Sequence, residues 1–310
     1  MTPAANHQQP TDEPGRPARD VPWTFEAAVK DPVVEEPVDW YFNRRIAIQV
    51  IQPLRWMGRG ITPAKITLVA ALFGVASGVS LCLVPTRGSV WYVAGGLLLF
   101  ASVILDCADG MVARLRGGGT PLGMLLDGAM DLVVGVSVWF GVSYAYLAGR
   151  TEWWGWPVAF FALVSIVLHC ALYDNLKNFF VRHSLPRADR PPIVAAAPKS
   201  AAWRMVNSVY LTAYGSVAKV FGTGEDAALE ASEPAEFRQE FSPTMRMACW
   251  LGLGSHLTFV YVCIFFGLID RAIPFYGVLA FVGLVQNVLV VFVVASRKRA
   301  VKRLRERLAS

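Results

Sequence analysis

The sequence predicts an all-α integral membrane protein with six transmembrane helices and an N-terminal amphipathic helix at the membrane surface. Of the 310 residues, 55% are hydrophobic and only 17% are charged, and the mean hydropathy is +0.43. About a quarter of the residues in a soluble domain are charged. Six windows are also apolar enough to form spans, each of which needs about 20 residues. The bilayer is therefore the expected solvent for most of the chain.

The six apolar windows follow one another along the chain. They cover 66–84, 91–105, 122–147, 156–172, 247–269 and 276–295. The second window is short, but its helix is expected to continue to about Arg116, because the run from Gly117 to Pro121 is the first strong helix breaker. An even number of spans places both termini on one side of the membrane.

The distribution of basic residues predicts the orientation, since cytosolic loops carry an excess of Lys and Arg. The predicted outer loops hold single basic residues, Arg87, Arg150 and Arg271, whereas the other side carries clusters that include Arg114 and Arg116. This pattern favours a membrane surface over nucleic acid as the reason for the net charge of +6. We expect a multi-pass protein of the inner (cytoplasmic) membrane, with both termini and the 106–131 hairpin facing the cytosol.

The segments outside the spans divide as follows. Residues 1–37 begin polar and proline-rich, without the apolar stretch of a signal peptide, and predict a disordered cytosolic tail. Residues 38–60 interleave aromatic and aliphatic side chains with Arg and Gln, which predicts an interfacial helix that Pro53 must kink or end. Residues 61–300 form the expected membrane domain, and 301–310 a basic cytosolic tail that binds anionic lipids.

A long polar segment separates the fourth and fifth windows, and we expect a cytosolic insertion at about 184–244. It is too long for a tight loop. Within it, residues 201–221 have a helical pattern, whereas 222–241 are acidic and rich in small residues. The latter predict a flexible linker, with a lid over an acceptor molecule as the alternative.

Four aspartates gather on the hairpin formed by the second and third spans. Asp106 and Asp109 fall on one stripe of their helix, and Asp127 and Asp131 on one stripe of the next. An antiparallel hairpin would set Asp106 level with Asp131, and Asp109 level with Asp127. Four carboxylates near the membrane interior repel one another and lose hydration. Two Mg²⁺ or Mn²⁺ ions would compensate, and a two-metal site suits phosphoryl transfer.

These aspartates and their neighbours are similar to the complete signature of the CDP-alcohol phosphotransferases. The matching positions are Asp106, Asp109, Gly110, Ala113, Arg114, Gly123, Asp127 and Asp131. The resemblance implies a homodimeric enzyme of phospholipid synthesis, in which an acceptor hydroxyl attacks the β-phosphorus of a CDP-alcohol, commonly CDP-diacylglycerol, and releases CMP. Many members carry Thr-Pro-Asn before the first span, whereas this chain has Ala64 in place of the asparagine. That departure concerns a polar contact near the nucleotide, not the metal site.

The same resemblance implies roles for individual residues. Asp106, Asp109 and Asp127 would bind the metals, with Asp131 beside them as the general base. The expected CDP-binding residues are Asp109, Gly110, Ala113, Arg114, Gly123 and Thr67. Near the end of the fourth span, Lys177 and Arg182 would bind an anionic acceptor, with membrane anchoring as the alternative. His169 and His256 lie in apolar helices and are expected to be hydrogen-bonded core residues.

Several alternatives stay open at this point. The acceptor is an inositol phosphate, a glycerol phosphate, an amino alcohol or another polyol, and the donor is CDP-diacylglycerol or a soluble CDP-alcohol. A cation transporter is the alternative from a different class, because carboxylates inside membranes commonly line ion paths. The location of all four acids on one hairpin, with few polar groups in the other spans, favours the enzyme.

Overall fold

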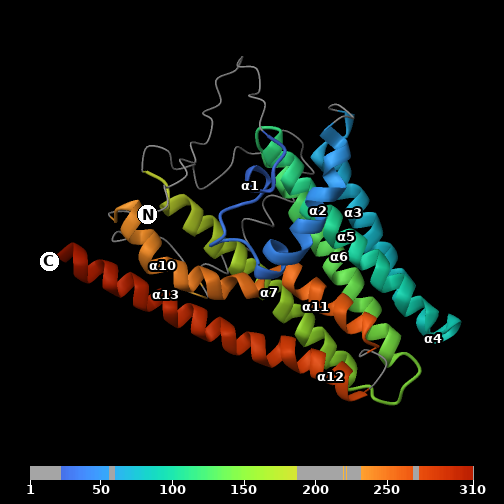
Figure 1. Ribbon diagram of the computed structural model, residues 1–310. Coiled ribbons are helices and arrows are strands. Elements are labelled where there is room, and N and C mark those ends of the chain that lie inside the picture. The colour runs from blue at the N-terminus through green and yellow to red at the C-terminus, as the bar shows by residue number, and fades with distance from the viewer. Residues whose placement is uncertain are drawn as a thin grey trace.

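The computed structural model describes residues 22–55, 60–186, 219, 221, 232–267 and 272–309, and this part of the chain is helical with no strand (Figure 1). Its elements are α1 (Phe25–Ala28), η1 (Asp39–Asn43), α2 (Arg44–Ile51), η2 (Gln52–Arg55), α3 (Pro63–Cys82), α4 (Val84–Arg87), α5 (Val90–Leu115), α6 (Pro121–Leu147), α7 (Gly155–His183), α10 (Pro234–Ala248), η5 (Cys249–Leu251), α11 (Leu253–Phe265), α12 (Ala272–Ala280), η6 (Phe281–Val285) and α13 (Gln286–Ala309).

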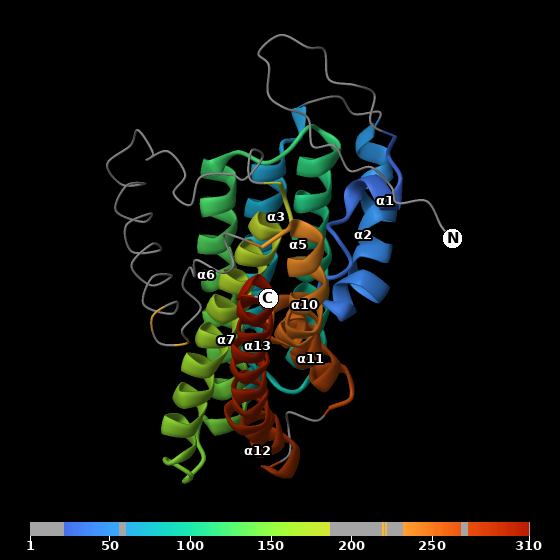
Figure 2. The ribbon, with the colours of Figure 1, turned by 90° about the vertical axis from the view of Figure 1, so that its left-hand side faces the viewer.

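The prediction of an all-α protein with several spans is confirmed. Among the described residues, five helices are long and apolar enough to cross a membrane, namely α3, α5, α6, α7 and the continuous helix Phe275–Leu308. A sixth span results if α10 to α11 is counted as one, although this pair is bent by 41°. In Figure 2, α1 and α2 lie on the α5 side of the bundle, and α13 runs in front of α7.

The helix ends follow the sequence signals. As predicted, α5 continues past the aspartates and ends before Gly117 and Gly118, whose φ values of +99° and +114° favour glycine. Thr120 then caps α6, because its hydroxyl accepts a hydrogen bond from the Gly123 amide at 3.0 Å. Thr62 caps α3 in the same way, and Pro63 occupies the first helical position. A tight turn therefore joins the two aspartate-bearing helices.

Small residues let α3 approach both helices that carry the aspartates. A Cβ atom added at Gly141 of α6 would lie 2.5 Å from the carbonyl oxygen of Gly78 on α3. Towards α5, the Ser102 hydroxyl donates to the Ala70 carbonyl at 2.8 Å. Helix association in membranes depends on such close backbone contact and on interhelical hydrogen bonds. Thus α3 fixes α5 and α6 relative to each other.

Replacing Gly141 with alanine should therefore lower the melting temperature of the protein in detergent, because the added methyl group meets a backbone oxygen that cannot rotate away. The matched control is Gly277→Ala in α12, where an added Cβ has no atom within 4 Å. The control should melt at or above the wild-type temperature, since alanine is the better helix former by about 1 kcal/mol. Equal melting of both variants would contradict the close approach of α3 and α6.

The structure corrects the expected disordered tail at 1–37. Residues 1–21 lie outside the described part, but residues 22–37, which we call the N-terminal strap, are ordered. The strap contains α1, whose first turn is capped by Thr24, and the side chains of Ala28 and Val34 are fully buried. The polar composition of this segment hides its order, because its charged side chains have partners on distant helices. Arg238 of α10, for example, pairs with Asp31 at 2.5 Å.

The end of the strap inserts a carboxylate into the break between α10 and α11. Glu36 Oε2 accepts hydrogen bonds from the amide (2.6 Å) and the hydroxyl (2.7 Å) of Ser255, in the first turn of α11. A Cβ at Gly252 would lie 2.1 Å from the Glu36 carboxylate, so glycine leaves the necessary room. Burial, and then the neighbouring Asp39, raise the pKa of Glu36 to about 8. The sequence predicts an unbroken fifth span over 247–269. The break at Gly252 escapes this prediction because its partner, Glu36, comes from a remote segment of the chain.

The raised pKa of Glu36 predicts a pH-dependent stability. Because the folded protein holds a proton that the unfolded chain releases above about pH 4.5, this contribution to stability is present at low pH and is lost as the pH rises towards about 8. Glu36→Gln keeps an oxygen acceptor for Ser255 but cannot ionise. We expect the melting temperature of the wild type, relative to Glu36→Gln, to fall between about pH 5 and pH 8. Parallel pH curves for the two proteins would refute this assignment.

The predicted interfacial helix at 38–60 consists of η1, α2 and η2 instead of one helix. The regular α-helix ends at Ile51, just before Pro53, whose ring and missing N–H prevent its continuation. Ala47 and Ile51 are buried, whereas Tyr41 is 77% exposed, so the element is amphipathic. Residues 56–59 lie outside the described part. The position of η1, α2 and η2 at the membrane interface stays a prediction.

Two segments towards the C-terminus are more regular than expected. The flexible linker and the insertion end earlier than predicted, because α10 begins at Pro234 and buries Phe237 and Phe241, whose rings stack at 4.5 Å. Glu240, on the same helix, forms ion pairs with Arg303 and Arg307, each at 2.6 Å. The basic residues after 300 therefore continue α13 as far as Ala309, and their contact with anionic lipids stays a prediction. The predicted helix at 201–221, apart from 219 and 221, and residues 222–231 of the predicted linker lie outside the described residues.

Candidate functional site

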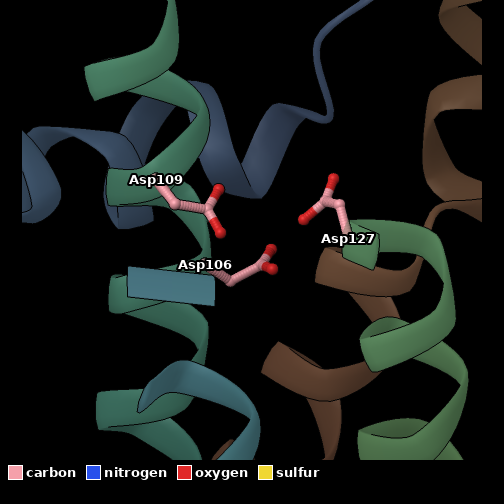
Figure 3. A group of neighbouring side chains, drawn as sticks. All are labelled: Asp106, Asp109 and Asp127. Carbon is pink, nitrogen blue, oxygen red and sulfur yellow. The ribbon is translucent and has the colours of Figure 1, made fainter. Parts of the chain in front are cut away.

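Three of the four aspartates converge between α5 and α6. Asp106 and Asp109 extend from α5 towards Asp127 of α6 (Figure 3), and one carboxylate oxygen of each lies within 4.8 Å of the others. We call these three residues the aspartate cluster. Asp131 lies one helical turn further along α6 and is not a member of this group. The structure thus sets Asp131 apart from the other three residues of the predicted metal site.

A hydroxyl group from α3 supports the cluster. The Thr67 hydroxyl donates to Asp109 Oδ2 at 2.5 Å, and both residues are buried. In metal sites, such partners orient the ligating carboxylate. The family resemblance implies that Thr67 binds CDP. In the structure its hydroxyl contacts Asp109. This role depends on the packing of α3 against α5, which the sequence pattern does not reveal.

The surface beside the cluster has little side-chain volume. A Cβ added at Gly110 would meet only the guanidinium of Arg114, at 3.5 Å. On α6, a Cβ at Gly123 would meet only the hydroxyl of Thr120, and a Cβ at Gly128 nothing within 4 Å. Ala113, also predicted to line the pocket, is partly buried. These positions leave room for a ligand to approach both helix backbones.

Arg114 offers an unused hydrogen-bond donor next to this space. Its Nε donates to the Ala28 carbonyl of the strap at 2.5 Å. Its Nη2 is buried and has no hydrogen-bond partner in the described part of the protein. A buried donor without a partner is costly, and a phosphate or carboxylate oxygen would satisfy it. The sequence predicts Arg114 as a site residue. It does not predict the contribution of Ala28, because that residue acts through its backbone carbonyl and not through its side chain.

Two further cations, Arg44 and Lys177, have acidic partners of their own. Arg44 of α2 pairs with Glu35 of the strap at 2.8 Å and also donates to the Cys107 carbonyl, next to Asp106. Lys177 of α7 forms an ion pair with Asp174 and lies 4.8 Å from the centre of the Tyr173 ring. Arg44 thus holds positive charge next to the backbone of the aspartate cluster.

The two predicted acceptor-binding residues do not share a direction. Arg182 follows Lys177 by five residues, which corresponds to a rotation of about 140° around the helix. Their side chains therefore leave α7 on different faces, and Arg182 is close to the helix end at His183. Lys177, in contrast, lies beside Tyr173, whose hydroxyl donates to the Val34 carbonyl of the strap at 2.8 Å. The structure therefore does not direct Lys177 and Arg182 to one place, and their role in acceptor binding stays a prediction.

The two histidines of the apolar helices contact each other away from the cluster. His169 Nδ1 lies 3.4 Å from His256 Nε2, and His169 Nε2 lies 3.1 Å from the Asn287 side-chain oxygen. His256 Nδ1 also lies 2.7 Å from the Gly252 carbonyl. Both histidines are buried. This agrees with the prediction of hydrogen-bonded core residues.

Comparison with known proteins identifies the family of this segment. Residues 60–213 match the family model of the CDP-alcohol phosphatidyltransferases. The relatives include phosphatidylinositol phosphate synthases from Corynebacterium glutamicum (35% identical over 30% of this chain and 36% of the relative), Mycobacteroides abscessus (32%, over 39% and 49%) and Mycobacterium marinum (34%, over 36% and 47%). The alignments with these three cover less than half of each relative's length.

The matched segment contains the residues around which the site is built: the aspartate cluster, Asp131, Thr67, Arg114 and Lys177. It begins just before α3 and excludes the strap and α2. The resemblance inferred from the aspartate signature is thereby confirmed. Residues 60–213 form a domain of the CDP-alcohol phosphatidyltransferase family.

Proposed function

We propose that this protein is a membrane-bound CDP-alcohol phosphotransferase of phospholipid synthesis. The observation that carries the proposal is the convergence of Asp106, Asp109 and Asp127 within 4.8 Å, inside the segment that matches the family. CDP-diacylglycerol is the expected donor, and a soluble CDP-alcohol is the alternative. The names of the relatives make an inositol phosphate the first acceptor to test.

The donor set of the cluster fits Mg²⁺ or Mn²⁺. Carboxylates are oxygen ligands, which these cations prefer, and the described residues that form the group include no sulfur or imidazole ligand. Three carboxylates so close together repel one another strongly unless a cation is bound. We assign Asp106, Asp109 and Asp127 as metal ligands and expect Asp131 to complete a site for two ions. When bound, such ions neutralise charge on the transferred phosphate.

The protein's own residues would bind the donor and move the proton. Arg114 would donate to the diphosphate of the CDP-alcohol, and Gly110 and Gly123 would let it approach the helices. Asp131 would accept the proton of the acceptor hydroxyl while that oxygen forms a bond to the β-phosphorus. The bond between the β-phosphorus and the bridging oxygen breaks, and CMP leaves with the electron pair. The product is a phosphodiester.

The same proposal includes the surroundings of the enzyme. We place it in the inner membrane, with both termini and the active site on the cytosolic side, because the basic clusters lie on that side of the predicted topology. Lipids would contact the exposed apolar side chains of the spans, such as Leu72 and Phe160, which are 69% and 68% exposed. A homodimer is expected from the family resemblance.

The first test is metal binding. Asp109→Asn should abolish tight Mn²⁺ binding by the purified protein, and Thr67→Val, which removes only the supporting hydroxyl, should weaken it by about 10-fold to 100-fold. Electron paramagnetic resonance of free Mn²⁺ measures both. Glu306→Gln removes a 63% exposed carboxylate on α13 and should leave the affinity unchanged. Wild-type affinity in Asp109→Asn would show that the cluster is not the metal site.

The second test is catalysis. Purified protein is incubated with radiolabelled CDP-diacylglycerol, Mn²⁺ and a panel of alcohols, and CMP and lipid product are measured. Asp131→Asn should lower kcat by about 10² to 10⁴ with little change in KM, as expected for loss of a general base. Glu306→Gln is again the control. Absence of metal-dependent CMP release with every donor and acceptor would refute the proposal, and Mn²⁺ uptake by proteoliposomes would support the transporter instead.

A further inference from the structure

The single turn α1 of the strap ends against Arg114. The chain becomes extended at Val29, so the carbonyl of Ala28, the last residue of α1, is left free of the helix's own hydrogen bonds. This carbonyl accepts the hydrogen bond from Arg114 Nε at 2.5 Å. Ala28 is fully buried, and a hydrogen bond from a guanidinium is strong in such surroundings. One side of the Arg114 guanidinium is therefore fixed by the strap.

The start of α1 is held by side chains of η1, α2 and η2. The Phe25 ring packs edge-on against Trp40, with 5.4 Å between the ring centroids, and the Arg45 guanidinium lies 3.7 Å from the centre of the Phe25 ring. The Gln52 side chain donates to the Trp23 carbonyl at 3.1 Å. Both η1 and α2 also contact α5. The position of α1 relative to α5 is thus set by residues outside the aspartate hairpin.

The strap is anchored again beyond α1. Arg238 of α10 pairs with Asp31 at 2.5 Å, and the Tyr173 hydroxyl of α7 donates to the Val34 carbonyl at 2.8 Å. A shift of α1 along α5 would therefore break contacts at one end of the strap or the other. The strap lies outside residues 60–213, the segment that matches the family.

The other side of the Arg114 guanidinium lies over Gly110. A Cβ atom at Gly110 would lie 3.5 Å from both Nη1 and Nη2, so the side chain folds back along α5 towards the turn that carries Asp109. Nη2 is buried and has no hydrogen-bond partner in the part of the chain that the structure describes. A free arginine side chain would spread over many rotamers. The bond to Ala28 favours the rotamer that directs Nη2 to the surface at Gly110.

We propose that the strap, through the Ala28 carbonyl, positions Arg114 to bind the diphosphate of a CDP-alcohol. This inference rests on the proposed function. A guanidinium can donate to a carbonyl through Nε and to a phosphate oxygen through Nη2 at the same time, because its N–H groups point in fixed directions. Less conformational entropy is lost on binding when the side chain is already ordered. Loosening α1 should therefore weaken CDP binding although no group that touches CDP is removed.

The experiment measures CDP binding to the full-length protein in lipid nanodiscs by titration calorimetry, with Mn²⁺ present. Phe25→Ala removes the ring that holds α1 and should raise the Kd for CDP by about threefold to tenfold, whereas Phe25→Tyr keeps the ring and should restore most of the affinity. Gln52→Leu removes the bond to the Trp23 carbonyl and should act in the same direction. Glu26→Gln changes an exposed side chain of the same turn and should bind CDP like the wild type.

A double-mutant cycle distinguishes positioning of Arg114 from a general loosening of the protein. Arg114→Gln alone should weaken CDP binding, and adding Phe25→Ala should cause no further loss, because no guanidinium is left to position. Mn²⁺ affinity should stay at the wild-type value in the strap variants, since the aspartate cluster is intact. In turnover, Phe25→Ala should raise the KM for the CDP-alcohol more than it lowers kcat. Should Phe25→Ala fail to fold, Gln52→Leu takes its place in the cycle.

Two results would overturn the proposal: wild-type CDP affinity when α1 is loosened, or losses that add up in the double variant. The first would show that the strap does not affect the arginine, and the second that it acts independently of Arg114. Failure of the proposed function would be seen separately, as wild-type protein that binds CDP but releases no CMP from a CDP-alcohol with any acceptor.

Discussion

The mutual repulsion of three carboxylates between two apolar helices is the constraint on which the rest of this structure depends. Asp106, Asp109 and Asp127 have oxygens within 4.8 Å of one another, and such groups also lose hydration in the bundle. A wider separation of α5 and α6 would relieve this repulsion when no cation is bound. The direct backbone contact of α3 with α6 at Gly78 and Gly141 opposes that separation.

A second layer of contacts comes from segments remote in sequence. The strap reaches α5 through Ala28, α7 through Val34 and α11 through Glu36. A neutral hydrogen bond contributes on the order of 1 kcal/mol, and one with a charged donor such as Arg114 about 1.5–3 kcal/mol, so the strap is held by the sum of several modest interactions. It connects α5, which carries two of the aspartates, with α7 and α11. One short segment, the strap, therefore contacts both Arg114 and the first turn of α11.

The sequence predicts the hairpin well because its determinants are local. Helical spacing places the aspartates on facing stripes, and Gly117 and Gly118 mark where the chain must turn. Order in the strap and in α10 escapes prediction because it depends on partners far along the chain. Arg114 and Ala28 are 86 residues apart, and Arg303 and Glu240 are 63 residues apart. Periodicity within a window cannot reveal such pairs, so polar composition alone suggests disorder.

The arrangement of charge bears on the choice between enzyme and transporter. A path for cations should present carboxylates and neutral oxygens along its length, without fixed positive charges at the narrow acidic point. Here Arg44 donates to the Cys107 carbonyl, next to Asp106, and a Cβ atom at Gly110, next to Asp109, would lie 3.5 Å from the Arg114 guanidinium. Such cations would repel a passing ion, but they would attract phosphate oxygens once the carboxylates are neutralised by bound metal. Fixed cations beside the acidic centre therefore favour the proposed phosphotransferase over a cation transporter.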